Sequence, residues 1–220
     1  SPVQAITTQS DKEQTLPSSL ELVITTNQPT HSLAETNELG INEVIGFGES
    51  HYDGSIPSRI ENVSLATKKV SDLLLAPGKE FSFNQAIGDV SAASGFKPAY
   101  IIRNGMTELG DGGGVCQVST TLFRAVLDAG LKVSRRLPHS YRVSYYELDH
   151  KPGIDATVFA GNVDLRFIND TNHYILIHGE AFPNSKYMND ALYGTSDGRT
   201  TEIVDHKTWG YSPPLPPVYI

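Results

Sequence analysis

A single cysteine constrains this chain more than any other feature of its sequence. Cys116 is the only cysteine in 220 residues, so no disulfide can form within the chain and no multi-cysteine zinc site is available. The fold must be held by a packed core, and a hydrophobic content of 39% is enough to build one domain of ordinary size. The thiol is then either a small buried side chain or a reactive group.

The net charge limits the classes of binding partner. Lys and Arg total 17 against 25 for Asp and Glu, a net charge of −8, which argues against a nucleic-acid binder and against a basic membrane-surface protein. No apolar run is long enough to span a bilayer, so we expect membrane attachment only through an upstream segment. No His-Glu-x-x-His motif and no phosphate-binding loop is present, and we expect neither a metal nor a cofactor.

The hydrophobic period changes along the chain. Apolar residues at three- and four-residue spacing predict a helix from Arg59 to Leu74 and a second from Val115 to Ala129, with Gly130 as its C-cap. Strand patterns are found at residues 20–26, 143–146, 156–160, 163–169 and 174–179. We therefore predict an α+β fold, in which a helix with the cysteine at its N-terminus packs on a mainly antiparallel sheet.

The surroundings of Cys116 favour a reactive thiol. The preceding segment Gly110-Asp-Gly-Gly-Gly114 is a flexible turn, and the cysteine falls in the first turn of the predicted helix. Unpaired helix N–H groups and the positive end of the helix dipole stabilise an anion there, and the same amides can bind an oxyanion. The alternative is a small buried side chain, the commonest role of a lone cysteine.

Two downstream residues complete a candidate triad. His139 lies in the loop Leu137-Pro-His-Ser140, and Asp155 opens the next predicted strand. The order of cysteine on a helix, then histidine, then aspartate is the order of papain-like and transglutaminase-like thiol enzymes, an analogy that only geometry can test. The alternatives are a surface-loop histidine and a strand-entry aspartate.

An arginine cluster surrounds the histidine in an otherwise acidic chain. Arg135, Arg136 and Arg142 flank His139, and a guanidinium binds a carboxylate through two parallel hydrogen bonds. The cluster is therefore a candidate dock for a substrate carboxylate. The alternative for Arg135 and Arg142 is a solvated strand end.

Several motifs together resemble the VanW family of bacterial cell-envelope proteins, named from a glycopeptide-resistance gene cluster. The resemblance runs from about Gly46 to about Phe182. It rests on Ser58-Arg-Ile-Glu-Asn-Val63, Pro77-Gly-Lys-Glu-Phe-Ser-Phe-Asn84, Gly112-Gly-Gly-Val-Cys-Gln-Val-Ser-Thr-Thr-Leu122, Arg136-Leu-Pro-His-Ser140 and Gly153-Ile-Asp-Ala-Thr-Val158.

The resemblance implies a peptidoglycan L,D-transpeptidase that forms 3–3 cross-links between stem peptides outside the cytoplasm. It makes Cys116 the nucleophile and His139 its base, and we extend the triad to Asp155 from chain order. Arg136 is assigned to a stem-peptide carboxylate. We expect further substrate contacts from Gly113, Gly114, Gln117 and Ser140.

The resemblance also suggests a domain plan. Residues 1–40 are expected to be a linker and the tail of a preceding peptidoglycan-binding-type domain, residues 41–183 the VanW-like catalytic domain, and residues 184–220 C-terminal strands with a proline-rich tail. Two other functions stay open: an NlpC-type cysteine peptidase or carboxypeptidase acting on cell-wall peptides, and a non-catalytic cell-wall binding module.

Overall fold

The computed structural model describes residues 38–103, 106–140, 142–148 and 150–207. The strand expected at 20–26, nearly all of the segment expected to be a linker, and the proline-rich tail therefore lie outside the described residues. None of the described helices is long and apolar enough to cross a membrane.

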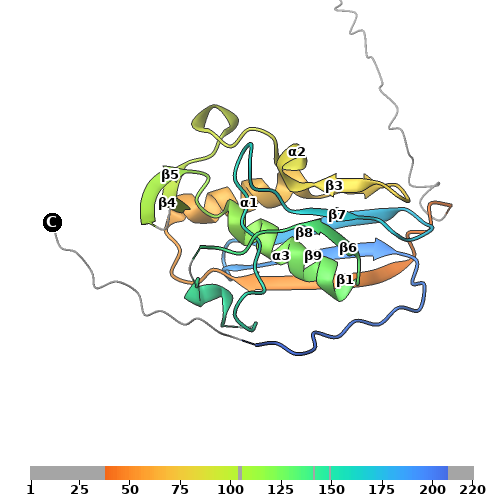
Figure 1. Cartoon of the computed structure of the whole chain (residues 1–220). Coiled ribbons are helices and arrows are strands. Elements are labelled where there is room, and N and C mark those ends of the chain that lie inside the picture. Colours follow the sequence, from red (N-terminus) through yellow and green to blue (C-terminus); the bar gives the residue numbers. More distant parts are fainter. Residues whose placement is uncertain (1–37, 104–105, 141, 149, 208–220) are drawn as a thin grey trace, which may run out of the picture. The chain divides into compact units, whose positions relative to one another are not determined.

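Three antiparallel sheets form the strand framework (Figure 1). The largest has four strands in the order β1 (Glu43–His51), β9 (Tyr187–Gly194), β8 (Ile175–Phe182) and β2 (Leu73–Leu75). The second has the order β3 (Glu80–Ser82), β7 (Arg166–Ile168) and β6 (Lys132–Arg135). The third is a hairpin of β4 (Pro98–Arg103) and β5 (Met106–Asp111).

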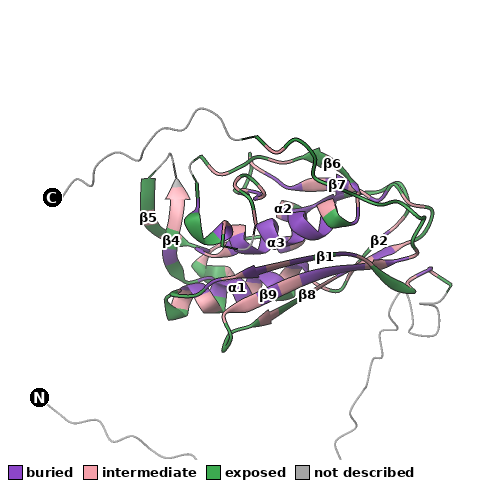
Figure 2. Ribbon diagram, turned by 90° about the horizontal axis from the view of Figure 1, so that it is seen from below, coloured by how far each residue is buried: buried purple, intermediate pink, exposed green. Residues whose placement is uncertain are grey.

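Two long helices pack against the four-stranded sheet. Helix α1 (Pro57–Val70) lies against β8, and α3 (Val115–Asp128) lies against β1 and β9. Figure 2 shows both helices beside these strands. The other helices in the described part of the chain are short: α2 (Phe83–Ile87), η2 (Ala92–Ser94) and η3 (Ser144–Tyr146). The α+β class and the mainly antiparallel pairing are confirmed.

Two glycines on β1 set the distance between the sheet and α3. A Cβ on Gly46 would lie 2.4 Å from the carbonyl oxygen of Ala125, and a Cβ on Gly48 would lie 2.3 Å from that of Thr121. Neither separation is possible between real atoms, so only glycine lets the backbones approach this closely. The helix is thereby seated directly on the strand.

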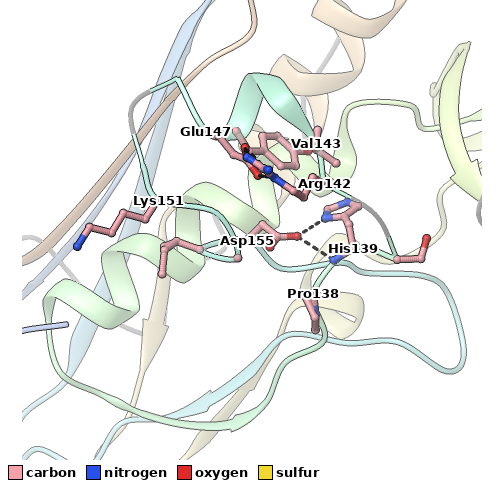
Figure 3. A pocket seen from close by; sticks show the side chains of 11 residues that line it. Pro138, His139, Arg142, Val143, Glu147, Lys151 and Asp155 are labelled. Atoms are coloured by element: carbon pink, nitrogen blue, oxygen red, sulfur yellow. Dashed lines mark hydrogen bonds and ion pairs between the residues drawn. The ribbon is translucent and has the colours of Figure 1, made fainter. Parts of the chain in front are cut away.

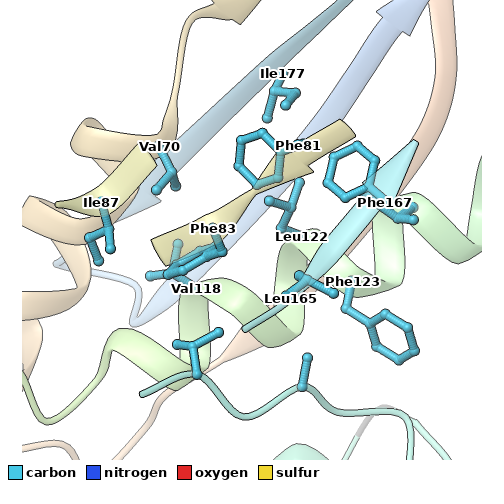
Figure 4. Close-up of a cluster of buried hydrophobic side chains, with 14 of the residues drawn as sticks. Val70, Phe81, Phe83, Ile87, Val118, Leu122, Phe123, Leu165, Phe167 and Ile177 are labelled. Atoms are coloured by element: carbon cyan, nitrogen blue, oxygen red, sulfur yellow. The ribbon is translucent and has the colours of Figure 1, made fainter. Parts of the chain in front are cut away.

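The core joins the helices to both larger sheets. The apolar stripe predicted for α3 is buried, including Val118 and Leu122 at 0% exposure. Figure 4 shows Leu122 beside Phe81 and Phe167 of the second sheet. The ring centroids of this phenylalanine pair lie 4.9 Å apart. The helix thus buries opposite sides of its surface against different sheets.

Several sequence-based elements differ in the structure. The first helix ends at Val70, because Asp72 takes a positive φ of 59° and Leu73–Leu75 pairs with β8 as β2. Residues 143–146, predicted as a strand, contain the 3₁₀ turn η3. Residues 156–160 form no regular strand and make only an isolated bridge between Phe159 and Val163. Strand β1 was not predicted. Strand β9 falls in residues 184–220, where C-terminal strands were expected, and it lies inside the main sheet between β1 and β8.

The buried carboxyl group of Asp190 generates a stability prediction. Asp190 lies on β9 at 0% exposure, and neither carboxyl oxygen has a hydrogen-bond partner among the described residues. Burial raises the pKa of Asp190 well above its usual value, so the folded state keeps a proton that the unfolded state releases as the pH rises.

We expect Asp190→Asn to become more stable relative to the wild type as the pH rises from 4 to 7. The gap in the free energy of unfolding should grow by at most about 1.4 kcal/mol per pH unit. Urea denaturation across this range measures it. A gap that is independent of pH would contradict the prediction.

Candidate functional site

The start of α3 presents Cys116 on a glycine turn. Gly114 is the N-cap residue, with a φ of 114° that favours glycine, and no side chain caps this end among the described residues. A Cβ on Gly113 would lie 2.6 Å from the carbonyl oxygen of Tyr100. The Asn62 amide donates to the Gly113 carbonyl at 3.0 Å and holds the turn in place. The first-turn amides are therefore positioned close to the half-buried thiol.

The structure pairs His139 with Asp155, two of the three residues of the predicted triad. The Nδ1 atom of His139 is hydrogen-bonded to Oδ2 of Asp155, and the backbone N–H of His139 donates to the same oxygen at 2.8 Å (Figure 3). Cys116 lies close enough to His139 to contribute to the raised pKa of the imidazole. Since Asp155 occupies Nδ1, Nε2 is the ring nitrogen that stays available for another group. The Cys116 Sγ atom lies 3.5 Å from the carbonyl oxygen of Val158.

Polar side chains of α3 fix the segment that carries the aspartate. The hydroxyl of Ser119 donates to the carbonyl of Ala156 at 2.7 Å, and the backbone N–H of Ala156 donates to the hydroxyl of Thr120 at 3.1 Å. The next residue, Thr157, donates its N–H to the carbonyl of Leu137 at 2.8 Å. The helix thus holds the aspartate segment, and that segment holds the loop with the histidine.

Electrostatics favour a charged histidine and a charged aspartate. Burial acts to lower the pKa of His139, but its hydrogen bonds to Asp155 and Cys116 and the nearby negative charge raise it to about 9. Burial acts to raise the pKa of Asp155, yet hydrogen bonds from His139 and the charge of Arg136 bring it below its usual value. At neutral pH the site therefore holds an imidazolium between a carboxylate and a thiol.

A buried tyrosine packs against the histidine. The ring centroid of Tyr146 lies 5.4 Å from that of His139, and the residue is 4% exposed. Burial, with the neighbouring Tyr145 and Cys116, raises the pKa of Tyr146 well above its usual value. Its phenol stays neutral, and the ring fixes the orientation of the imidazole.

Arg136 contacts the protein's own acceptors. Its Nε donates to the carbonyl of Asp155 at 2.6 Å, and Nη2 donates to the carbonyl of Gly153 and lies 3.4 Å from Asp155 Oδ1. The guanidinium carbon lies 5.0 Å from the ring centroid of Phe123. These contacts position the aspartate, while the role predicted for Arg136 in substrate binding stays a prediction.

Gln117 belongs to a buried polar network that the sequence did not reveal. The residue is 0% exposed; its Nε2 donates to the hydroxyl of Ser50 at 2.6 Å, and its Oε1 accepts from Nη2 of Arg59 at 2.9 Å. Arg59 lies in the first turn of α1 and was given no role from sequence. The available signal was its place in the Ser58-Arg-Ile-Glu motif directly after Pro57.

A pocket of about 260 Å³ opens on the side of the histidine and aspartate. Ser140 is exposed at its edge, and Cys116 is not one of its lining residues. Figure 3 shows charged side chains lining the pocket, among them Arg142, Glu147 and Lys151. The lining consists of Pro138, His139, Ser140, Arg142, Val143, Tyr146, Glu147, Lys151, Gly153, Ile154 and Asp155. Within the described residues, no group of three or more His, Cys, Asp or Glu side chains is arranged to hold a metal.

Fold and site together define an α+β domain with a paired histidine and aspartate and a cysteine at the start of a helix nearby. The family model described as VanW like protein matches residues 58–189. The chain therefore belongs to the VanW-like family. The match contains every candidate triad residue and Arg59.

Two curated relatives support this membership. The protein is 41% identical over 141 residues to the uncharacterized protein YoaR of Bacillus subtilis strain 168. The alignment covers 64% of this chain and 45% of the relative. It is 32% identical over 141 residues to the vancomycin B-type resistance protein VanW of Enterococcus faecalis V583. This alignment covers 64% of this chain and 50% of that protein. The chain thus spans about half the length of these relatives. No solved structure matches the chain.

The raised pKa of His139 gives a direct test of the site's geometry. We expect the ring resonances of His139 to titrate near pH 9 in the wild type, and the midpoint to fall toward about 6.5 in Asp155→Asn, because the carboxylate that stabilises the imidazolium is lost. NMR titration of the ring protons measures both values. A wild-type midpoint at 6.5 would show that the contact does not form.

The same pKa shift sets the sign of the pH dependence of stability. A raised pKa means that the folded state favours the protonated ring, so this stabilisation is full below about pH 6.5 and is lost as the pH rises through 9. The wild type should therefore lose more of its free energy of unfolding between pH 6.5 and 9.5 than Asp155→Asn does. Equal losses in the two proteins would argue against this linkage.

Proposed function

We propose that the chain is a cysteine acyltransferase acting on bacterial cell-wall peptides, and specifically a peptidoglycan L,D-transpeptidase that forms 3–3 cross-links. The observation that supports it most is the hydrogen bond between His139 and Asp155, with Cys116 close enough to contribute to the raised pKa of the imidazole. A thiol enzyme needs a nucleophile, a base in contact with it and a group that orients the base. The name of the vancomycin-resistance relative agrees with a role at the cell envelope, outside the cytoplasm.

The proposed first step is attack on the donor peptide. The imidazolium of His139 stabilises a thiolate on Cys116. The sulfur attacks the carbonyl carbon of the third stem residue, and the N–H groups of the first turn of α3 stabilise the oxyanion. The bond to the terminal D-alanine then breaks. His139 gives its proton to the departing amine, leaving a thioester on Cys116.

The proposed second step is transfer to an amine. Neutral His139 accepts a proton as the side-chain amine of a second stem peptide attacks the thioester carbonyl. The new amide forms, the carbon–sulfur bond breaks and the thiolate returns. The pocket beside His139 offers space for this second substrate. Water as acceptor would instead give a carboxypeptidase.

The positions of Cys116, His139 and Asp155 support the catalytic roles that the corresponding residues have in papain-like or transglutaminase-like enzymes. Cys116 starts a helix, whereas His139 and Asp155 come from extended segments joined through a backbone hydrogen bond from Thr157 to Leu137. In this arrangement the helix contributes the nucleophile and oxyanion amides, and the extended segments contribute the base and its orienting acid.

Incubation with disaccharide-tetrapeptides tests the proposal. We expect the wild type to produce 3–3 cross-linked dimers, detected by mass spectrometry. Cys116→Ala should produce none, because the nucleophilic sulfur that carries the acyl group is missing. Shortened monomers without dimers would favour the hydrolase. Identical product profiles from the wild type and Cys116→Ala would favour the non-catalytic module and contradict the proposal.

Thiol alkylation tests the role of the histidine without any substrate. Because the chain has one cysteine, iodoacetamide labelling reports on Cys116 alone. At pH 6.5 we expect the wild type to be alkylated at least about tenfold faster than His139→Gln, since the imidazolium stabilises the reactive thiolate. Arg166→Gln, at a half-buried position on β7 where Arg166 pairs with Glu80 and Asp164, serves as the control. Equal rates in the wild type and His139→Gln would contradict the pairing.

A further inference from the structure

Arg59 is a buried cation that lacks an acidic partner. The residue is 8% exposed. Its guanidinium donates to the hydroxyl of Ser55 at 2.7 Å and to the amide oxygen of Gln117 at 2.9 Å, and its carbon lies 5.1 Å from the ring centroid of Tyr145. Each of these contacts is to a neutral group. Among the residues that the structure describes, no carboxylate forms an ion pair with Arg59.

A second buried donor lies near the same charge. Tyr52 is 1% exposed, and its hydroxyl has no hydrogen-bond partner in the described part of the chain. Ser55 joins the two residues, since its N–H donates to the Tyr52 carbonyl at 3.3 Å and its hydroxyl accepts from Arg59, and the charge of Arg59 acts to lower the pKa of the Tyr52 hydroxyl against the effect of burial. A buried cation without a counter-charge and a buried hydroxyl without a partner both cost free energy unless something satisfies them. A single anion placed between them would satisfy both.

The position of Arg59 relates this anion to the nucleophile. Arg59 is hydrogen-bonded to Gln117, the residue after Cys116, and its Cγ would lie 3.3 Å from a Cβ on Gly114, the first residue before the helix. In a peptide attacked at its last amide bond, the terminal carboxylate lies about one residue, roughly 4 Å, from the attacked carbonyl. Arg59 thus contacts Gly114 and Gln117, the residues on either side of Val115 and Cys116, and a carboxylate one residue beyond the attacked carbonyl would lie in this neighbourhood.

We propose that Arg59, together with the Tyr52 hydroxyl, binds the free carboxylate of the amino acid that leaves from the donor peptide. This inference rests on the proposed function for the identity of the peptide. It makes Arg59 a specificity-determining residue. Donors ending in a free carboxylate one residue beyond the attacked carbonyl are accepted, whereas donors with a neutral end leave the buried cation unpaired. Arg136 is distinct, because its donors already bind the Gly153 and Asp155 segment.

Binding measurements on the inactive Cys116→Ala protein test this inference without turnover. The ligands are a stem tetrapeptide with a free C-terminal carboxylate and the same peptide with a C-terminal amide, measured by isothermal titration calorimetry at pH 7. We expect the free acid to bind at least about tenfold more tightly. Adding Arg59→Gln should abolish this preference, Arg59→Lys should retain part of it, and Tyr52→Phe should reduce it by a smaller factor.

The controls separate a binding defect from a folding defect. Each variant is compared by circular dichroism and thermal unfolding, and Arg59→Lys keeps the charge if Arg59→Gln does not fold. Cys116→Ala with Arg166→Gln should keep the full preference. Equal binding of acid and amide to Cys116→Ala, binding of neither peptide, or an unchanged preference in a folded Arg59→Gln variant would overturn the inference. A wild type that makes no cross-links but keeps the acid preference would contradict the proposed reaction alone.

Discussion

The close approach of α3 to β1 is the constraint on which the rest of the site depends. Gly46 and Gly48 remove the two side chains that would separate the helix from the sheet. With its axis fixed on this side, α3 directs Ser119 and Thr120 to the opposite segment, where both bond Ala156. The cysteine and the aspartate are thus placed by one rigid element. A bulky residue at either glycine would shift the helix, and with it the geometry between the thiol and the imidazole.

The charges of the site are maintained because each one is paired despite burial. Asp155 accepts two hydrogen bonds from His139 and lies beside Arg136, so its carboxyl stays ionised although burial opposes it. That negative charge in turn keeps His139 protonated. Asp190 shows the contrary case, since this aspartate has no hydrogen-bond partner among the described residues and burial raises its pKa well above the usual value, so it keeps its proton. The difference between a charged and a neutral buried aspartate here comes from hydrogen bonding.

The sequence indicated the helix around Cys116 because a glycine run and a regular apolar period are local signals. Strand β1 left no such signal. Its inward positions include Gly46 and Gly48, whereas Val44 and Phe47 are 50% and 42% exposed, so the usual alternation of apolar and polar residues is absent. The segment 143–146 has strand-like composition but forms η3, whose Tyr146 carbonyl accepts from the distant Arg124 at 2.7 Å. Chain order suggested the contact between His139 and Asp155, and only the tertiary structure supplies its distances.

The sequence could not single out Arg59, because its distinguishing property depends on the tertiary structure: it is buried with no acidic partner among the described residues. An arginine on the first turn of a helix is unremarkable until the fold buries it beside neutral groups alone. Arg136, chosen from sequence for its place beside His139, contacts carbonyls and a carboxylate of its own chain, which neutralise its charge in the resting protein. A ligand carboxylate gains more binding free energy from a cation that has no acidic partner than from one that must first give up an existing carboxylate. The same reasoning favours Arg59 for recognition of the donor carboxylate, whereas the substrate-binding role of Arg136 stays a prediction.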